Sequence, residues 1–125
     1  MEPLVTNIED ATKENTNFRK VLHTGPKRQS QLTVMSLKPG EDIGMEVHEG
    51  DQFLRIEQGK GKAILGGQEY EVEDDFAIVI PAGTEHNVVN TGGEDMKLYS
   101  IYSPAEHPEG TIHATKAEAE EAEGH

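Results

Sequence analysis

The chain has 125 residues, which is enough for one domain with a hydrophobic core and leaves little room for a second. It contains no cysteine, so disulfides, iron–sulfur clusters and cysteine-ligated zinc are excluded. The 24 acidic residues outnumber the 11 Lys and Arg, giving a net charge of −13. We therefore expect no binding to nucleic acid or to an anionic membrane surface, and interpret the charge mainly as a solubility feature.

The first residues, MEPLVTNIED, lack the basic, apolar and small-residue succession of a secretory signal. The longest apolar run, residues 76–80, is far too short to span a bilayer. We expect a soluble, cytoplasmic protein. Residues 1–17 are polar and weakly patterned, and are predicted to be an N-terminal extension.

Residues 18–103 predict an all-β domain. Short apolar or alternating runs recur about every 8–12 residues, with Gly, Pro and Asp turns between them, which favours a sandwich or barrel over a βαβ protein. The run at residues 76–80 is continuously apolar, so both of its faces are expected to be covered. The predicted strands are residues 18–23, 31–37, 43–48, 52–57, 62–65, 70–72, 76–80, 86–90 and 96–102.

Residues 104–125 predict a C-terminal arm followed by an acidic tail. The segment KAEAEEAE, residues 116–123, is suited to a short exposed helix that would be marginal alone, so we expect it to be frayed or disordered. His107 and His113 lie in the arm. They are interpreted as part of a loop that packs on the barrel or on a partner subunit; the alternative is a lid that supplies a general acid or base.

Four polar residues form the candidate site. Glu46 and His48 are two apart, so on a strand they share a face with side chains roughly 7 Å apart. Gln52 follows at the start of the next predicted strand and would lie beside His48 if the two strands form a hairpin. His86 follows the turn residues of IPAGTEH. The two hairpins would each supply part of one cluster.

The first of these segments resembles one motif of the cupin superfamily. That motif runs Gly, five residues, His-x-His, three or four residues, Glu, six residues, Gly. In this chain the corresponding residues are Gly40, Glu46, His48, Gln52 and Gly59. The first family His is therefore replaced by Glu46, and the family Glu by Gln52.

The second segment resembles the other cupin motif, which runs Gly, five residues, Pro-x-Gly, two residues, His, three residues, Asn. Asp75 stands in place of the first Gly, and Pro81, Gly83, His86 and Asn90 match. The resemblance implies a single-domain, RmlC-like jelly roll, a double-stranded β-helix barrel spanning residues 18–103. Small cupins of this kind are loosely grouped with mannose-6-phosphate isomerase-like proteins.

By resemblance, the metal ligands would be Glu46, His48, Gln52 and His86. A common cupin set has three His and one Glu, so the single negative charge is kept but moved. Two nitrogen and two oxygen donors suit divalent Mn, Fe, Co, Ni or Zn, and disfavour cuprous copper. Gln52 could instead bind a metal-bound water or orient His48. A barrel that has lost its metal is the other alternative.

Side-chain alternation separates the inside of the predicted barrel from the outside. Leu54 and Ile56 share a face with Gln52 and should line the interior. Arg55 faces the other way and is interpreted as a surface or interface residue. One of Tyr99 and Tyr102 should reach the interior, since they lie on opposite faces.

The predicted function is that of a metal-dependent enzyme on a small polar molecule, either isomerase-like or dioxygenase-like. An isomerase would use the metal as a Lewis acid, and a carboxylate or His to move the proton. The alternative is a binding module for a small ligand or metal, without turnover. Relatives of this kind often pair through terminal strands, so a homodimer is expected.

Overall fold

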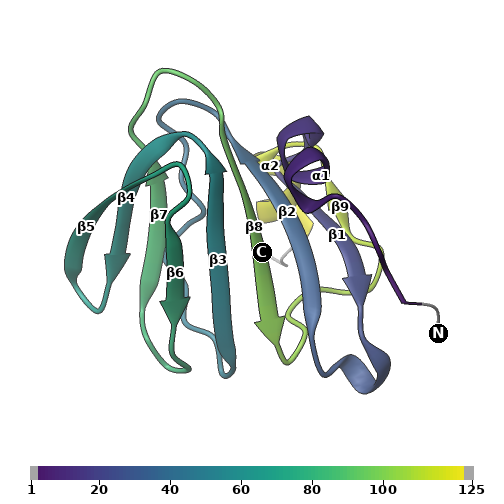
Figure 1. Cartoon of the computed structure of the whole chain (residues 1–125). Helices are drawn as coiled ribbons and strands as arrows, with labels where there is room; N and C mark the ends of the chain where they lie inside the picture. Colours follow the sequence, from purple (N-terminus) through teal and green to yellow (C-terminus); the bar gives the residue numbers. More distant parts are fainter. Residues whose placement is uncertain (1–2, 123–125) are drawn as a thin grey trace.

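The computed structural model describes residues 3–122, and its regular structure consists mainly of antiparallel strands (Figure 1). This confirms the predicted all-β jelly roll. The elements in chain order are α1 (Ile8–Glu14), β1 (Arg19–Thr24), a 3-10 turn (Pro26–Arg28), β2 (Gln31–Leu37), β3 (Asp51–Gln58), β4 (Lys60–Leu65), β5 (Gln68–Glu73), β6 (Ala77–Ile80), β7 (His86–Asn90), β8 (Met96–Ser103), β9 (Ile112–His113) and α2 (Lys116–Ala122).

The strands form two sheets. The larger has the order β6-β3-β8-β2-β1-β9, and the smaller has the order β5-β4-β7. Within the larger sheet, the register places Ile56, Leu98 and Met35 in one row across β3, β8 and β2, all fully buried. Leu54 and Ile56 are both in the core, as predicted from their shared face.

Helix α1 covers the outer face of the larger sheet, where it contacts β2, β3 and β8 (Figure 1). The side chain of Asn7 caps the helix by accepting a hydrogen bond from the backbone nitrogen of Asp10 at 3.0 Å. Beneath the helix, the buried Lys97 ammonium donates to the Asn15 carbonyl at 2.7 Å and to the Ser36 hydroxyl at 3.0 Å. The lysine is thus buried with two hydrogen-bond acceptors, which offsets its desolvation.

The strand predicted at residues 43–48 is wrong. This segment is a loop that follows β7 through isolated bridges, at Asp42 with Val89 and at Glu46 with His86, and its Gly44 nitrogen donates to Asn87 Oδ1 at 3.0 Å. Gly44 separates the two bridges with φ of 105°, a left-handed conformation that interrupts an extended strand. The predicted alternation survives, since Met45 and Val47 are exposed while Glu46 and His48 turn inward.

The run at residues 76–80 is also different from its prediction. Strand β6 is an edge strand whose side chains alternate, with Ile78 and Ile80 buried and Val79 67% exposed. Only one face of β6 is covered by the core. A continuous apolar run therefore misled the prediction, because its outer residues lie on an open sheet face.

The C-terminal helix is ordered, contrary to the expectation of fraying over residues 116–122. A capping box begins it: the Thr115 hydroxyl accepts from the Glu118 nitrogen at 3.2 Å, and the Glu118 carboxylate accepts from the Thr115 nitrogen at 3.1 Å. Lys116 also pairs with Asp42, and Ala119 is buried in the core. These contacts stabilise a helix that would be too short to be stable on its own. Residue 123 of the predicted segment lies outside the described residues.

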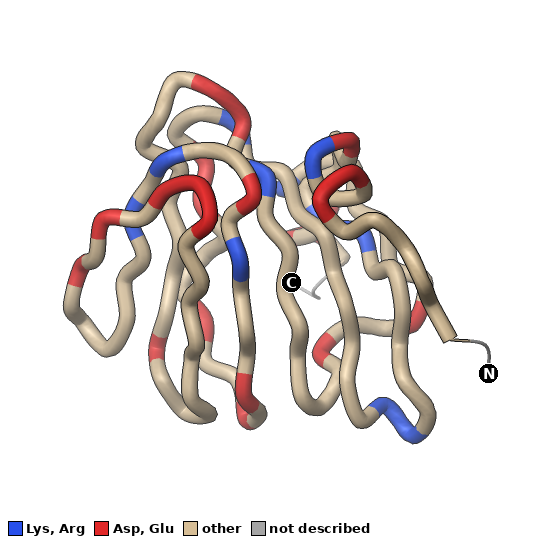
Figure 2. Tube along the Cα trace, in the orientation of Figure 1, with Lys and Arg blue, Asp and Glu red and all other residues tan. Residues whose placement is uncertain are grey.

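Figure 2 shows acidic residues along α1 and β5 and on the loop before β8, with Lys and Arg residues scattered among them. Within the described residues, no helix has both the length and the apolar composition needed to cross a membrane.

Gly61 tests the fit between strands β4 and β7. A Cβ atom at this position would lie 2.1 Å from the Val89 carbonyl oxygen and 2.5 Å from the Met96 methyl carbon. We expect Gly61→Ala to lower the free energy of unfolding by about 1–3 kcal/mol, because the crowded backbone must move. Gly93→Ala is the matched control, since its Cβ would meet nothing within 4 Å. Urea unfolding followed by circular dichroism measures both; equal stabilities would contradict this packing.

Candidate metal centre

The loop before β3 delivers Glu46 and His48 to the barrel interior. Two backbone hydrogen bonds, both 2.9 Å, join Glu46 and His86 in each direction. Beyond them, the His48 carbonyl accepts from the Gly83 nitrogen, also at 2.9 Å. The loop is therefore held against the turn that precedes β7 and against the first residue of that strand. Residues far apart in the sequence meet here by main-chain pairing.

The side chains of Glu46, His48 and His86 come together at this point. The Glu46 Oε2 atom lies 3.8 Å from His48 Nε2, and the two imidazole centroids are 5.0 Å apart. His86 is buried, His48 nearly so, and Glu46 is partly exposed. Among the residues that the structure describes, no three His, Asp or Glu side chains are arranged as a complete metal cage.

Both imidazoles, His48 and His86, have an oxygen acceptor beside their Nδ1 atom. His86 Nδ1 lies 2.9 Å from the Thr84 carbonyl oxygen, which can only accept, so the proton belongs on Nδ1. His48 Nδ1 lies 3.3 Å from a carboxylate oxygen of Glu106, which favours the same tautomer. In each ring, Nε2 then carries the lone pair that a metal requires.

Gln52 is on the opposite wall of the site. It is 3% exposed, and the register on β3 sets it between Ile80 of β6 and Tyr102 of β8. The predicted hairpin between residues 43–48 and β3 is wrong, because that segment follows β7 instead. The Gln52 amide nitrogen donates to the Ser100 hydroxyl at 3.1 Å, while its Oε1 atom is buried without a hydrogen-bond partner.

Tyr102 is the tyrosine that reaches the interior. Its ring contacts His48 edge-on at 5.7 Å and His107 at 5.3 Å, whereas Tyr99 faces outward against Phe53. Burial raises the pKa of the Tyr102 hydroxyl, with a smaller contribution from the Glu46 charge. The hydroxyl therefore stays protonated at neutral pH.

The sequence prediction missed Glu106 as a member of the site. Residues 104–111, here called the arm, cross from the end of β8 to the start of β9 and bring the Glu106 carboxylate to His48. The neighbouring His107 is buried against Tyr102, as expected for a loop packed on the barrel. The arm was recognised from its composition, but sequence spacing gives no indication that a residue 58 positions after His48 returns to it.

Arg19 is a second residue to which the sequence prediction gave no role. It is buried in the interior row that also holds Met35, with its guanidinium 5.3 Å from the Phe18 ring centroid. Burial is the main cause that lowers the pKa of His107, and the positive charge on Arg19 adds to it; together with other nearby charges they bring this pKa to about 3. His107 is thus neutral at physiological pH.

Arg55 has the surface role that was predicted. Its guanidinium pairs with Glu57 at 3.2 Å and with Asp75 at 3.0 Å, on the outer side of β3. These carboxylates raise its pKa. Of the two carboxylates, Glu57 is buried, whereas Asp75 is exposed and its pair with Arg55 contributes little to stability.

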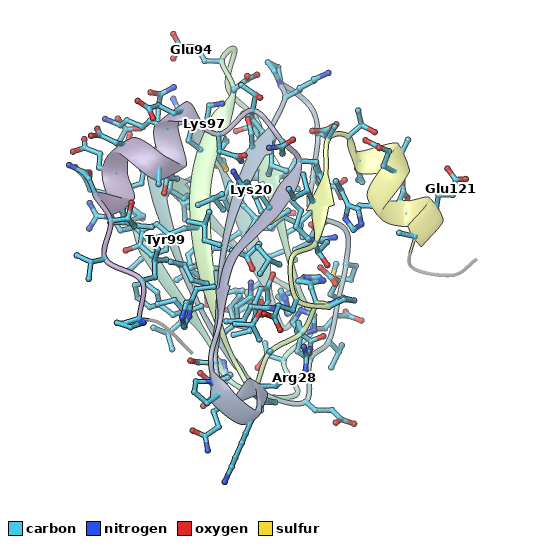
Figure 3. All side chains as sticks on the ribbon, turned by 90° about the vertical axis from the view of Figure 1, so that its right-hand side faces the viewer. Lys20, Arg28, Glu94, Lys97, Tyr99 and Glu121 are labelled. Carbon is cyan, nitrogen blue, oxygen red and sulfur yellow. The ribbon has the colours of Figure 1, made fainter. Side chains whose placement is uncertain are left out.

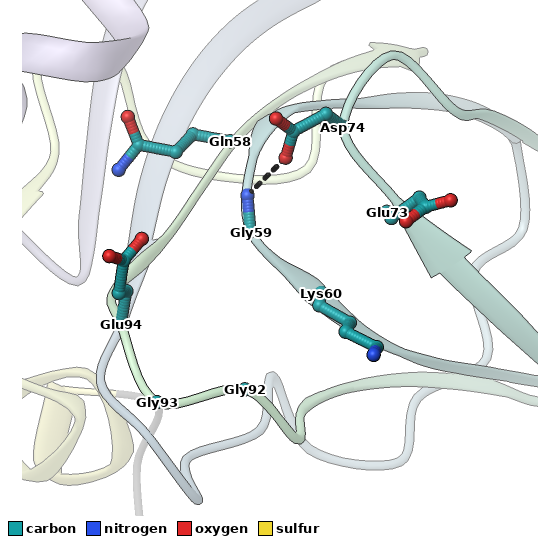
Figure 4. A pocket seen from close by; sticks show the side chains of 8 residues that line it. All are labelled: Gln58, Gly59, Lys60, Glu73, Asp74, Gly92, Gly93 and Glu94. Carbon is teal, nitrogen blue, oxygen red and sulfur yellow. Dashed lines mark hydrogen bonds between the residues drawn. The ribbon is translucent and has the colours of Figure 1, made fainter.

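A surface hollow of about 360 Å³ lies away from the candidate site (Figure 4). It includes Lys60 of β4, while His86 pairs with Leu65 at the other end of that strand. Asp74 accepts a hydrogen bond from the Gly59 nitrogen at 2.7 Å in its rim. None of the predicted ligands lines this hollow. Its lining residues are Gln58, Gly59, Lys60, Glu73, Asp74, Gly92, Gly93 and Glu94.

Comparison with known proteins gives consistent matches over most of the chain. Residues 33–102 match the family model of the cupin domain. YrkC, an uncharacterized protein of Bacillus subtilis (strain 168), is 54% identical over 129 residues, covering 98% of this chain and 68% of YrkC. The crystal structure of BH2720 from Bacillus halodurans has a TM-score of 0.92 at 53% identity, covering 96% of this chain and 95% of that chain.

A more distant structure shares the fold alone. KdgF from Halomonas sp. has a TM-score of 0.63 at 21% identity, covering 70% of this chain and 78% of that chain.

The buried His107 predicts a pH dependence of stability. Because its pKa is about 3 in the folded protein and near 6.5 when unfolded, the unfolded state binds more protons between these values. Stability should therefore fall as pH decreases through this range. In His107→Phe, which keeps the aromatic contact, the loss between about pH 7.5 and about pH 5.5 should be ~1 kcal/mol smaller than in the wild type. Urea unfolding at both pH values checks this; identical losses would contradict it.

Proposed function

Because this chain belongs to the cupin family, we propose that it is a metal-dependent enzyme acting on a small polar molecule. The metal would be held by Glu46, His48, Gln52 and His86. The observation that supports this most is the Oε1 atom of Gln52, which is buried in the barrel with no hydrogen-bond partner. An orphaned carbonyl oxygen is costly unless something binds it, and a hard divalent cation or its bound water suits it.

The donor set also fits a divalent ion. Two imidazole Nε2 atoms, one carboxylate and one amide oxygen suit Mn, Fe, Co, Ni or Zn. The Nδ1 atoms of both rings lie beside acceptors, the Thr84 carbonyl and the Glu106 carboxylate, as is usual for metal-binding histidines. Gln52 would serve either as a direct ligand or as the partner of a metal-bound water.

The side chains around this set supply the remaining chemistry. The bound metal would act as a Lewis acid in an isomerase, or would bind dioxygen in a dioxygenase. Glu46 is the partly exposed carboxylate of the set, so its Oε2 atom can exchange a proton between the site and solvent. Tyr102 keeps its proton and can donate a hydrogen bond to an oxygen of the substrate.

A binding module without turnover is the alternative function. The burial of the donors favours it, since Gln52 and His86 are 3% and 2% exposed and leave little room for a substrate. Loading the protein with each metal and assaying sugar phosphates, keto acids and oxygen consumption separates the two. Turnover lost in Glu46→Gln supports the enzyme, whereas tight metal binding with no turnover supports the module.

Metal binding is tested on stripped protein by calorimetric titration with Mn, Co, Ni and Zn, and with Fe under anaerobic conditions. We expect one site per chain, and a loss in His48→Ala and His86→Ala exceeding the ~10–100-fold typical of an outer partner. Glu46→Gln should weaken binding, while Glu49→Gln, an exposed residue of the same loop, should not. Gln52→Glu should tighten binding but destabilise the metal-free protein, because it buries a carboxylate. No binding of any of these metals by the wild type would reject the ligand set.

The predicted homodimer and cytoplasmic location stay predictions. The terminal strands expected to pair with a neighbour are used within the chain, where β1 pairs with both β2 and β9. The outer face of β6, β3 and β8 offers another contact, since Val79, Phe53 and Ile101 lie in one row across it. Val79 and Ile101 are both exposed there.

Light scattering measures the assembly directly. We expect twice the chain mass of 13.7 kDa for the wild type, and a shift toward the monomer in Val79→Glu, because two charges would be buried at a symmetric contact. Val5→Glu is the control, since Val5 is exposed and lies outside this row. A monomeric wild type would reject the dimer.

A further inference from the structure

The arm carries a carboxylate back to the candidate metal centre after the barrel strands are complete. We propose that Glu106 is a positioning residue that orients His48 for metal binding, and that Gln31 is the latch that fixes the arm in place. This inference rests on the proposed function. It gives the C-terminal arm a role in completing the site.

The latch is the side-chain amide of Gln31, which is 1% exposed at the start of β2. Its Nε2 atom donates to the His107 carbonyl at 2.8 Å and to the Thr24 hydroxyl at 2.9 Å. Its Oε1 atom accepts from the backbone nitrogens of His107 at 3.0 Å and of Glu106 at 3.2 Å. One buried amide thereby bonds three main-chain groups of the arm, a segment that no strand of the barrel pairs.

Two further contacts restrict the arm at its beginning. Arg28, labelled near the arm in Figure 3, donates to the His107 carbonyl at 3.0 Å, and its own carbonyl accepts from the Ala105 nitrogen at 3.0 Å. On the other side, Gly50, in the site loop (residues 43–50), packs so closely that a Cβ atom there would lie 2.5 Å from the Cδ atom of Pro104, the first residue of the arm. The arm and the site loop are thus fitted to each other.

The physical effect of Glu106 follows from the chemistry of imidazole. A neutral ring has one N–H, and a carboxylate can only accept, so Glu106 at 3.3 Å from Nδ1 favours the proton on that atom. Glu46 is the more distant carboxylate, at 3.8 Å from Nε2, so Glu106 is the better placed of the two to take the N–H and to leave Nε2 with the lone pair. The acceptor beside Nδ1 of His86 is a main-chain carbonyl, whereas the carboxylate beside Nδ1 of His48 belongs to a remote segment.

The first test compares metal affinity in variants of the arm. Glu106→Ala should weaken Mn, Co, Ni or Zn binding by about 10–100-fold, and Glu106→Gln should recover part of this loss because its amide oxygen still accepts from Nδ1. Glu109→Ala, an exposed glutamate of the same arm, is the control and should leave affinity unchanged. Equal affinities for the wild type and Glu106→Ala would overturn the proposal.

Gln31→Leu tests the latch. It should lower affinity as Glu106→Ala does and speed hydrogen exchange of the amides at residues 105–107, with the barrel strands still protected. In the double variant the losses should not add, because both changes remove the same contact. Unchanged exchange in the arm, or fully additive losses, would refute the latch.

A readout without metal separates this inference from the proposed function. Nitrogen-15 NMR of the His48 ring in stripped protein should show the Nδ1-protonated tautomer in the wild type and in Glu106→Gln, and a mixture in Glu106→Ala. If the wild type binds no metal yet shows this pattern, the proposed function fails while the positioning role of Glu106 stands. The same tautomer in all three proteins would overturn the positioning role.

Discussion

The candidate site depends on one main-chain pairing, the two reciprocal hydrogen bonds between Glu46 and His86. They anchor an irregular loop to the first residue of β7 and set Glu46 beside the imidazole of His86. His48, two residues further on, then reaches the interior because its carbonyl is held by Gly83. Upstream, Gly44 interrupts the ladder, and the next main-chain bond to β7 runs from the Ile43 nitrogen to the Val88 carbonyl at 3.0 Å. A loop suits this role because it can direct the side chains of Glu46 and His48 inward without being part of either sheet.

The interior of the barrel has an apolar row and a polar row of side chains. On the inner face of the larger sheet, one row holds Ile56, Leu98 and Met35, and another holds Gln52, Tyr102 and Gln31. The apolar row supplies burial, while each member of the polar row must find hydrogen-bond partners or cost stability. Gln31 satisfies its amide on the arm, whereas Gln52 leaves its carbonyl oxygen orphaned. The two buried amides of this row therefore differ in how their oxygen atoms are satisfied.

Period-two alternation predicted most of the fold and half of the site. It identified the buried face of β3 and the inward direction of Glu46 and His48, because alternation follows from backbone geometry alone. It failed at residues 76–80, where an edge strand carries apolar side chains on an open face, and at residues 43–48, where a glycine interrupts pairing. The role of Glu106 could not be predicted from the sequence for a different reason. Its contact with His48 is made by a segment whose course is set by the side chain of Gln31, and no local pattern encodes such a return.

Compared with the cupin motif, the negative charge stands at Glu46 and not at the position of Gln52, and the structure gives this difference a physical reason. In the cupin pattern the carboxylate stands at the position of Gln52, which here is 3% exposed on a central strand. In this chain the carboxylate is at Glu46, whose side chain is 26% exposed on the loop. Burying an unpaired carboxylate is far more costly than burying an amide, so the exchange moves the charge to where water can solvate it. The barrel can therefore fold with a neutral amide oxygen on its rigid wall and the charged oxygen on the loop.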